Sequence, residues 1–355
     1  MIRRIRHLVL LAAACGGTDP EPGTGPGIPP GGALAIVPVT ANLPPGSTEE
    51  VLAAFRATYD AGARGYFLSY RWSELEPQAG QYRLDDLQAT LQTITGLGFS
   101  RVLVGIQVIN TNRKETPPDL LAVGWDAPVM QARFRQLLDR VVPLFGGNVA
   151  WLSIGNEVDA YLGPAGQWGP YTSFFGQARE HARGLRPGLP VGVTTIFDGA
   201  RGAWRSQVQA LNAHADVAIW TYYGNDGAFR ALGPEAGSQA LREMVSLAAG
   251  KPVVVQELGQ ASSAINGGSD DRQARFFAST LAEWSAIGAA AMPFVSQFAL
   301  HDFPGWLCDE LLQYYGTGPN TPFREFLCTL GLRRQDGSAK PAWDSVRAFG
   351  RRAGS

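Results

Sequence analysis

The sequence predicts a (β/α)8 barrel that forms one domain over residues 33–350. Short apolar runs rich in β-branched residues alternate with longer segments of helical period, and eight such pairs follow one another. The runs are apolar on both faces, as in a parallel sheet that is covered by helices. A length of 355 residues with 45% hydrophobic residues is enough for the large core of such a barrel.

The strands are expected at residues 33–39, 64–70, 101–109, 149–156, 190–196, 216–223, 252–257 and 289–298. The first helix is expected to begin at Ser47 or Thr48, either of which can cap it, with Glu50 in its first turn. The other helices are expected at residues 84–97, 128–145, 172–185, 203–214, 238–249, 270–287 and 341–349. A doubly wound sheet is the alternative, but no GxGxxG follows the first run and no change of composition divides the chain.

The composition excludes several classes of protein. Lys and Arg number 30 against 31 Asp and Glu, so the chain has no basic surplus with which to bind nucleic acid. The 43 glycines and 24 prolines punctuate apolar segments, which argues against general disorder. Three cysteines are too few for a small disulfide scaffold, and no CxxC or HExxH motif is present. We therefore expect neither a metal nor another cofactor.

The first 15 residues have the features of an export signal. Residues 1–7 carry three arginines, and residues 8–14 form an apolar run that is too short to span a bilayer. Cys15 follows three alanines and resembles the lipid-modified cysteine of the bacterial lipobox, although Ala12 stands where that motif prefers Leu. Plain secretion with ordinary cleavage is the alternative. Residues 16–32, rich in Gly and Pro, are expected to form a flexible linker between a membrane anchor and the barrel.

Export also bears on the other two cysteines. Cys308 and Cys328 lie in one region that we expect to be rich in loops. Disulfides persist in the oxidising compartments outside the cytosol, so we expect a disulfide between them. The alternative is two separate buried thiols.

Two glutamates stand at the carboxyl ends of predicted strands. Glu157 directly follows the fourth run, and Glu257 ends the seventh. A carboxylate at such a place is costly to bury unless it is paired, hydrogen-bonded or functional. The active sites of these barrels lie at the carboxyl ends of the strands, so the two glutamates are candidate catalytic residues, with a structural ion pair as the alternative for either one.

These residues resemble clan A of the glycoside hydrolases, which are retaining (β/α)8 enzymes. The resemblance rests on Asn156-Glu157 at the fourth strand and on Glu257-Leu258-Gly259 after Lys-Pro-Val-Val-Val at the seventh. Trp72-Ser-Glu-Leu-Glu-Pro followed by Gly80 and Tyr82 resembles the clan's segment after strand two, and Gly337 to Trp343 resembles its lead-in to the last helix. The resemblance implies that Glu157 is the acid/base and Glu257 the nucleophile. It also implies a tyrosine bonded to the nucleophile, for which we choose Tyr223, with Tyr222 as the alternative.

The chemistry of retention asks for the same pair. One carboxylate attacks the anomeric carbon and the other protonates the leaving oxygen, with the two groups about 5–5.5 Å apart. Glu157 must begin protonated, which requires a raised pKa, and must later act as a base towards water. Asn156 is expected to hold the sugar 2-hydroxyl.

The sequence departs from the clan's pattern at three positions. Phe67 stands near the place of an arginine inside strand two, although Arg71 could reach inward instead. Phe298, or Trp306 from the following loop, must replace the tryptophan that often ends strand eight, and Thr221 stands where many members keep a histidine. Aromatic residues near the strand ends are candidate platforms for sugar rings: Trp72, Trp125, Tyr161, Trp168 and Trp306.

We therefore predict an exported, membrane-anchored lipoprotein, acting as a monomer, that hydrolyses a β-linked oligo- or polysaccharide with retention. Its partners are a carbohydrate substrate and a membrane, the latter through the lipid on Cys15. The alternatives are a transglycosylase that uses the same two glutamates and a glycan-binding lipoprotein that keeps the barrel without turnover.

Overall fold

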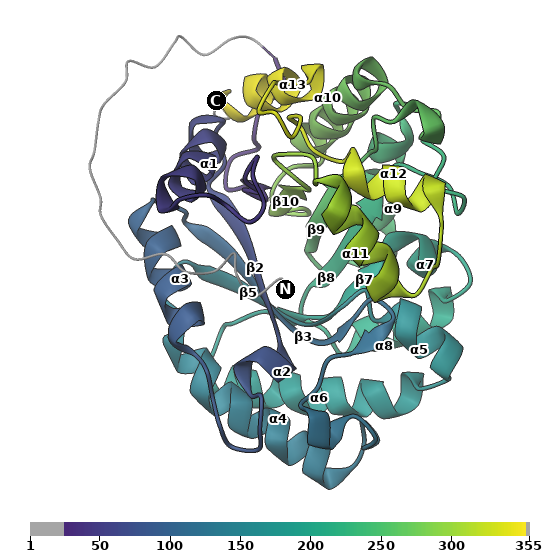
Figure 1. The fold of residues 1–355 in the computed structure, drawn as a ribbon. Coiled ribbons are helices and arrows are strands. Elements are labelled where there is room, and N and C mark those ends of the chain that lie inside the picture. The colour runs from purple at the N-terminus through teal and green to yellow at the C-terminus, as the bar shows by residue number, and fades with distance from the viewer. Residues whose placement is uncertain (1–24, 353–355) are drawn as a thin grey trace.

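The computed structural model describes residues 25–352, which form the predicted (β/α)8 barrel (Figure 1). The strands of the ring are β1 (Ala33–Ile36), β2 (Gly65–Arg71), β3 (Arg101–Asn110), β5 (Val149–Asn156), β6 (Val191–Gly192), β7 (Thr194–Ile196), β8 (Ala218–Tyr223), β9 (Val253–Gly259) and β10 (Phe294–Gln297). These strands are parallel, and β1 pairs with β10. An interruption at Val193 divides the fifth predicted strand into β6, which pairs with β5, and β7, which pairs with β8. A short β4 (Arg113–Lys114) adds antiparallel to β3.

The eight predicted helices are present in the outer layer. They are α1 (Thr48–Asp60), α3 (Asp85–Gly96), α4 (Pro128–Val141), α6 (Trp168–Leu185), α8 (Arg205–Ala213), α9 (Ala236–Leu247), α10 (Asp270–Ile287) and α13 (Pro341–Gly350). Ser47 caps α1, because its hydroxyl accepts a hydrogen bond of 3.2 Å from the backbone N–H of Glu50. Inside the ring, Trp151 and Phe294 pack edge to face and fill the barrel together with residues such as Leu103 and Val254.

Several further helices occur outside the eight expected ranges. They are α2 (Trp72–Leu75), α5 (Asp159–Ala165), α7 (Phe197–Arg201), α11 (Gly305–Tyr315), α12 (Thr321–Cys328) and the 3-10 turns Pro118–Leu120 and Ala264–Asn266. A 3-10 turn, Val142–Leu144, continues α4 within the expected range 128–145. The expectation of a loop-rich region around the two cysteines is therefore wrong, since Cys308 lies on α11 and Cys328 ends α12. In Figure 1 these two helices lie in front of the strands on the β7–β9 side of the barrel. We call α11 and α12, with the chain between them, the helical lid.

The N-terminal part of the domain begins earlier than expected. The flexible linker is expected over residues 16–32, but in its described part Ile28 packs against the barrel core and Gly27 is buried beside the backbone of Arg352. Residues 1–24, which include Cys15 and the rest of the predicted export signal, lie outside the described residues. No helix within residues 25–352 is long and apolar enough to span a membrane.

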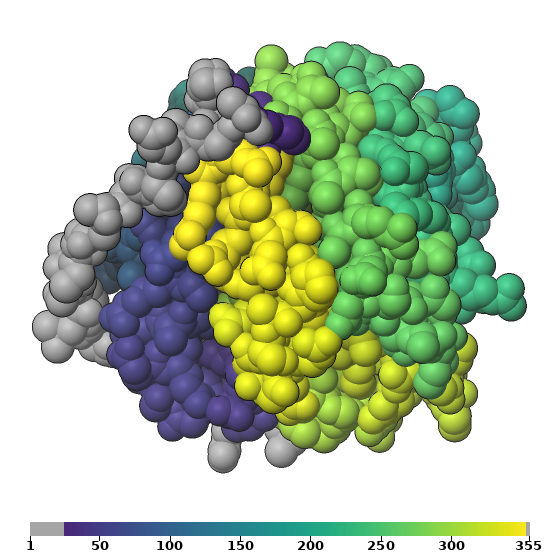
Figure 2. All heavy atoms as spheres, turned by 90° about the horizontal axis from the view of Figure 1, so that it is seen from above, coloured from purple at the N-terminus to yellow at the C-terminus, as the bar shows by residue number. Residues whose placement is uncertain are grey.

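The C-terminal segment holds the two ends of the domain together. In Figure 2 the C-terminal residues, in yellow, lie between the N-terminal residues in purple and the green helices that precede them. Lys340, just before α13, is buried, and its ammonium donates to Asp302 Oδ1 at 2.7 Å and to Ser262 Oγ at 3.1 Å. Residues 337–343, which resemble the clan's segment before the last helix, therefore bond the start of α13 to the loops at the mouth of the barrel.

Candidate active site

Both strand-end glutamates point into one cavity at the carboxyl end of the barrel. Glu257 lies within β9, and Glu157 directly follows β5 with a φ of 49°. Gly155 makes this turn possible, because its φ is 92° and a Cβ there would lie 2.4 Å from Val158 and 2.5 Å from the Tyr171 hydroxyl. The backbone therefore turns sharply at Gly155, near the end of β5, and the next side chains, Asn156 and Glu157, line the cavity.

Thr221 holds Glu157 beside the strand that carries Glu257. Its hydroxyl donates to Glu157 Oε1 at 2.7 Å, while its backbone is in register with Glu257 on the neighbouring strand β9. Both carboxyl groups line the same cavity, and the Glu157 carboxyl is close enough to raise the pKa of Glu257. A second donor, Thr111 at the end of β3, bonds Glu157 Oε2 at 2.7 Å. The threonine found where many clan members keep a histidine thus has a defined contact.

Glu257 is held by its own neighbours. The Tyr223 hydroxyl donates to Glu257 Oε2 at 2.6 Å, and the Gln256 amide donates to Oε1 at 3.5 Å. The structure thus brings Tyr223, the first choice from the sequence, to the predicted nucleophile. Tyr222, the alternative, is buried on the other face of β8, where its hydroxyl donates to the backbone oxygen of Ala236 at 3.3 Å.

The environment raises the pKa of both carboxyl groups. Burial raises the pKa of Glu157, opposed by the hydrogen bonds from Thr111 and Thr221. Burial and the nearby Glu157 carboxyl raise the pKa of Glu257 to about 7, opposed by the bonds from Tyr223 and Gln256. Burial thus disfavours the charged form of both carboxyl groups, and the charge of Glu157 further opposes ionisation of Glu257. One acid and one carboxylate side by side are what double displacement requires.

Asn156 is oriented by hydrogen bonds that all run in one direction. Its amide oxygen accepts from Gln256 Nε2 at 2.6 Å, and its amide nitrogen donates to Asn110 Oδ1 at 3.0 Å. Asn110 Nδ2 in turn donates to the Tyr314 hydroxyl at 2.9 Å, which donates to Glu115 Oε1 at 2.7 Å. Because the carboxylate can only accept, it fixes which way each amide points. Tyr314 belongs to α11, so the lid takes part in this relay.

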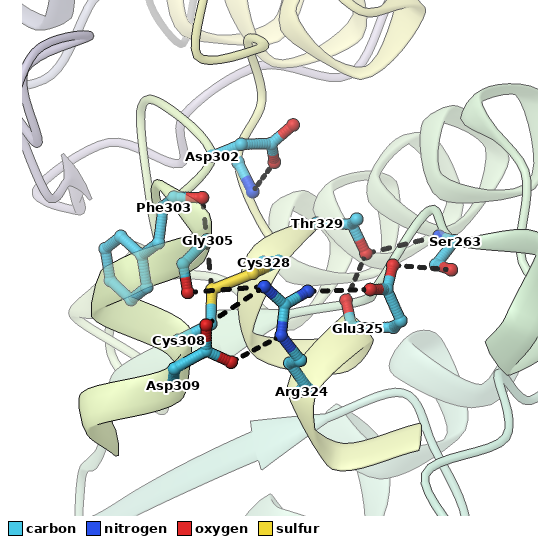
Figure 3. The surroundings of a disulfide bond; sticks show 11 residues. Ser263, Asp302, Phe303, Gly305, Cys308, Asp309, Arg324, Glu325, Cys328 and Thr329 are labelled. Carbon is cyan, nitrogen blue, oxygen red and sulfur yellow. Dashed lines mark hydrogen bonds and ion pairs between the residues drawn. A yellow bond between two sulfur atoms is a disulfide. The ribbon is translucent and has the colours of Figure 1, made fainter. Parts of the chain in front are cut away.

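The cavity has a volume of about 820 Å³ and lies between the strand ends and the helical lid. Tyr223 packs edge to face on Phe326 of α12, with ring centroids 5.1 Å apart. The disulfide between Cys308 and Cys328 joins α11 to α12, and Arg324 beside it pairs with Asp309 at 2.6 Å and Glu325 at 3.1 Å (Figure 3). The lid is therefore fixed both internally and against the site.

Several predicted contacts with substrate are wrong. Trp72 is fully buried against Phe134 and bonds Glu76, and Arg71 forms an ion pair with Glu74 at 2.7 Å instead of reaching into the cavity. Trp306 lies on the lid with 44% of its surface exposed, but it does not line the cavity. The other three proposed platforms also lie outside the cavity: Trp125, Tyr161 and Trp168. The turn and helix of α2 orient Trp72 and Arg71 away from the barrel mouth.

Phe298 and Phe67 do line the cavity, and so does a residue that the sequence did not indicate. Tyr315, the last residue of α11, lies near Thr111 and the two glutamates, and burial, followed by the charges of the glutamates, raises its pKa. Its helical spacing from Leu307 and Leu311, which also line the cavity, is the signal that could have revealed it.

The described residues contain no group of three or more His, Cys, Asp and Glu side chains placed to hold a metal ion. His301 serves the fold, because its Nδ1 lies 2.7 Å from the backbone oxygen of Val39.

No family model and no curated protein matches this chain. Solved structures with a similar fold include a GH5_18 variant from Bifidobacterium longum subsp. longum in complex with Manβ1-4GlcNAc, which is 17% identical over 90% of this chain and 77% of that chain, with a TM-score of 0.68. GH5_18 from Streptomyces cattleya in complex with GlcNAc is 17% identical over 90% of this chain and 80% of that one, with a TM-score of 0.67. The exo-β-1,4-mannosidase Op5Man5 from Opitutaceae bacterium strain TAV5 is 17% identical, with a TM-score of 0.68 over 90% of this chain and 58% of its own. These likenesses establish the (β/α)8 fold that the sequence predicts.

Proposed function

We propose that this chain is a retaining glycoside hydrolase that acts on β-linked substrates. The observation that carries the proposal is the pair of buried carboxyl groups, Glu157 and Glu257, which line one cavity and interact electrostatically. The retaining mechanism requires these groups to lie about 5–5.5 Å apart, whereas inverting enzymes need about 6.5–9.5 Å to admit a water between them. The glycosidases among the structures of similar fold agree with the proposal without deciding it.

The reaction takes two steps. Ionised Glu257, oriented by Tyr223, attacks the anomeric carbon and forms a glycosyl ester, while Glu157 gives its proton to the leaving oxygen as the glycosidic bond breaks. Glu157 then takes a proton from water, whose oxygen attacks the same carbon and releases Glu257. Asn156, held by Gln256 and Asn110, donates or accepts at the sugar 2-hydroxyl, where contacts strengthen in the transition state.

The test is the hydrolysis of 4-nitrophenyl β-glycosides and defined β-glucans, mannans, xylans and galactans by the wild type and two variants. Glu257→Ala is expected to lower kcat/KM at least about 10³-fold, and Glu157→Gln to spare activated aryl glycosides more than natural linkages, since a good leaving group needs little protonation. A slow 2-fluoro glycoside is expected to leave a covalent adduct on Glu257. Wild-type rates in both variants, or an adduct on another residue, would refute the assignment.

We further propose that the protein is exported and lipid-anchored at Cys15. The disulfide in the lid supports an oxidising location, because such bonds persist outside the cytosol. Metabolic labelling with palmitate tests the anchor: wild-type protein is expected to incorporate the label and Cys15→Ala to remain unlabelled. Equal labelling of both would contradict it.

A further inference from the structure

The lid presents an almost wholly apolar wall to the cavity. Six of its residues and of the loop that leads into it line the cavity: Phe303, Leu307, Leu311, Phe323, Phe326 and Leu327. The polar residues that the lid adds are Tyr315, beside the glutamates, and Thr317. Among the described residues that line the cavity, none is basic, and the acidic ones are Glu157, Glu257 and Asp198. Most of the side chains that could bond sugar hydroxyls, such as Ser69, Gln107 and Asn225, lie on the barrel side of the cavity, so the lid side offers few partners to hydroxyl groups.

A second apolar wall stands at the start of the barrel. Val37, Pro38, Val39 and Leu43, from the loop between β1 and α1, line the same cavity. The strands at this point separate, because β1 and β2 share a single register pair, Ala35 with Gly65. The cavity of about 820 Å³ lies near the upper end of the ~300–1,000 Å³ range of small-molecule sites, and most of its lining is hydrocarbon.

The polar groups gather beside the catalytic pair. Three polar residues near the pair line the cavity: Asn110, Thr111 and Asn156. Asn156 donates a hydrogen bond to Asn110, and Thr111 donates one to Glu157. A glycosidase must hold one sugar at its carboxyl pair, and these groups meet that need. The leaving group, on the other side of the scissile bond, need not be a sugar. The apolar walls are therefore available to bind a leaving group that is itself apolar.

The apolar wall is already formed in the absence of a ligand. The Cys308–Cys328 disulfide and the Arg324 ion pairs fix α11 against α12 (Figure 3), and Asn320 caps α12 by accepting from the backbone N–H of Phe323 at 3.0 Å. Tyr315 ties the lid to the opposite rim, because its backbone oxygen accepts from Asn112 Nδ2 at 2.7 Å. When an apolar group binds to a preformed apolar surface, few side chains of that surface lose conformational entropy.

We propose that the substrate is an amphiphilic β-glycoside whose aglycone is an alkyl or aryl group. The sugar lies at Glu157 and Glu257, and the aglycone lies against Leu307 and Leu311 of the lid and against Phe303 of the loop before it. This inference rests on the proposed glycosidase function and adds the class of leaving group to it. Burial of each methylene contributes ~0.8 kcal/mol, which corresponds to at most about a fourfold gain in kcat/KM per methylene.

The test compares methyl, butyl, hexyl and octyl β-D-glucosides and β-D-mannosides, below their micelle concentrations, with cellobiose and mannobiose. The wild-type chain is expected to show kcat/KM rising two- to fourfold per methylene up to butyl, and to prefer octyl glycosides to the disaccharides. Equal kcat/KM for methyl and octyl glycosides, or a tenfold preference for a disaccharide, would overturn the inference while leaving the glycosidase proposal intact. Failure to hydrolyse any glycoside, 4-nitrophenyl ones included, would instead remove the proposed function.

Binding gives a readout that does not depend on turnover. Titration of the Glu257→Gln protein with octyl and methyl glycosides is expected to give at least tenfold tighter binding of the octyl compounds, and equal binding would overturn the inference. Leu311→Asn is expected to reduce the octyl-to-methyl ratio of kcat/KM about tenfold. The matched control is Leu121→Asn, at a leucine that is 51% exposed and lies outside the cavity lining, which is expected to keep the wild-type ratio.

Discussion

Asn156 has its amide orientation set by a carboxylate that it never touches. The series of bonds from Gln256 through Asn156, Asn110 and Tyr314 ends at Glu115, on the strand-three side of the barrel mouth. Removal of one hydroxyl from the series leaves an amide nitrogen without its acceptor and lets the amides upstream rotate. A site residue is thereby positioned by a tyrosine of the lid.

Tyr314→Phe tests this relay. A hydrogen bond is worth about 0.5–1.5 kcal/mol, so kcat/KM is expected to fall roughly two- to tenfold on β-glycosides that carry a 2-hydroxyl. On the matching 2-deoxy glycosides the variant is expected to equal the wild type, because the contact that Asn156 makes is then absent. Steady-state kinetics on both substrates measure the difference. A similar loss on the 2-deoxy compound would show a merely structural role, and Tyr59→Phe on α1 is the control for the substitution.

At the scale of secondary structure, the barrel elements were predictable and the lid was not. The β-branched runs and the 3.6-residue periods place every strand of the ring, and Asp270–Ile287 coincides with its prediction. The eighth strand is shorter than expected, because Ala289 to Ala291 have no β-branched side chain and the sheet begins only at Phe294. Signals for the lid existed, since Asn320 before Thr321-Pro322 is a good helix start and Gly316 a good helix end. A (β/α)8 barrel needs only eight outer helices, and the sequence already predicted eight without the two helices of the lid.

The site was predictable only in part for a related reason. Glu157, Glu257, Asn156 and Tyr223 follow from their places at strand ends, where the barrel itself dictates direction. Trp72 follows a strand as well, but the short helix α2 turns it into the core. Sequence spacing reports which element carries a residue, whereas a single helical turn decides whether that side chain faces the cavity or the interior.

The disulfide is expected to stabilise the lid more than the barrel. Cys308 and Cys328 are separated by 20 residues, and a closed loop of this size is worth about 3 kcal/mol by restricting the unfolded chain. The double variant Cys308→Ser/Cys328→Ser is therefore expected to melt at a lower temperature and to exchange amide hydrogens of α11 and α12 at least tenfold faster. Hydrogen exchange with mass spectrometry measures both regions. An equal increase in β3 and β9 would show that the bond supports the whole barrel, and reduced wild-type protein should behave as the variant does.

For the whole molecule, the buried acids at the barrel mouth reduce stability at neutral pH. Burial raises the pKa of Asp159 to about 7, and burial with the Glu157 carboxyl raises that of Glu257 to about 7. The unfolded chain, with ordinary carboxyl pKa values of 3.8 for Asp159 and 4.5 for Glu257, releases these protons between those values and pH 7, whereas the folded chain retains them. The free energy of unfolding therefore falls as the pH rises through this window, and below it these groups cost nothing.

Glu257→Gln is expected to restore the stability that the wild-type chain loses as the pH rises. The amide keeps an oxygen that accepts from Tyr223 and carries no charge to desolvate, so at pH 7.5 the variant should be more stable than the wild type by up to about 3 kcal/mol. At pH 3 the two should unfold alike, because the wild-type carboxyl, whose ordinary pKa is 4.5, is then protonated in both states. Urea unfolding at the two pH values measures the difference, with Glu49→Gln on the exposed face of α1 as the control. A variant equally or less stable at pH 7.5 would mean that Tyr223 and Gln256 already compensate the buried charge, and that the active site is held without cost to the fold.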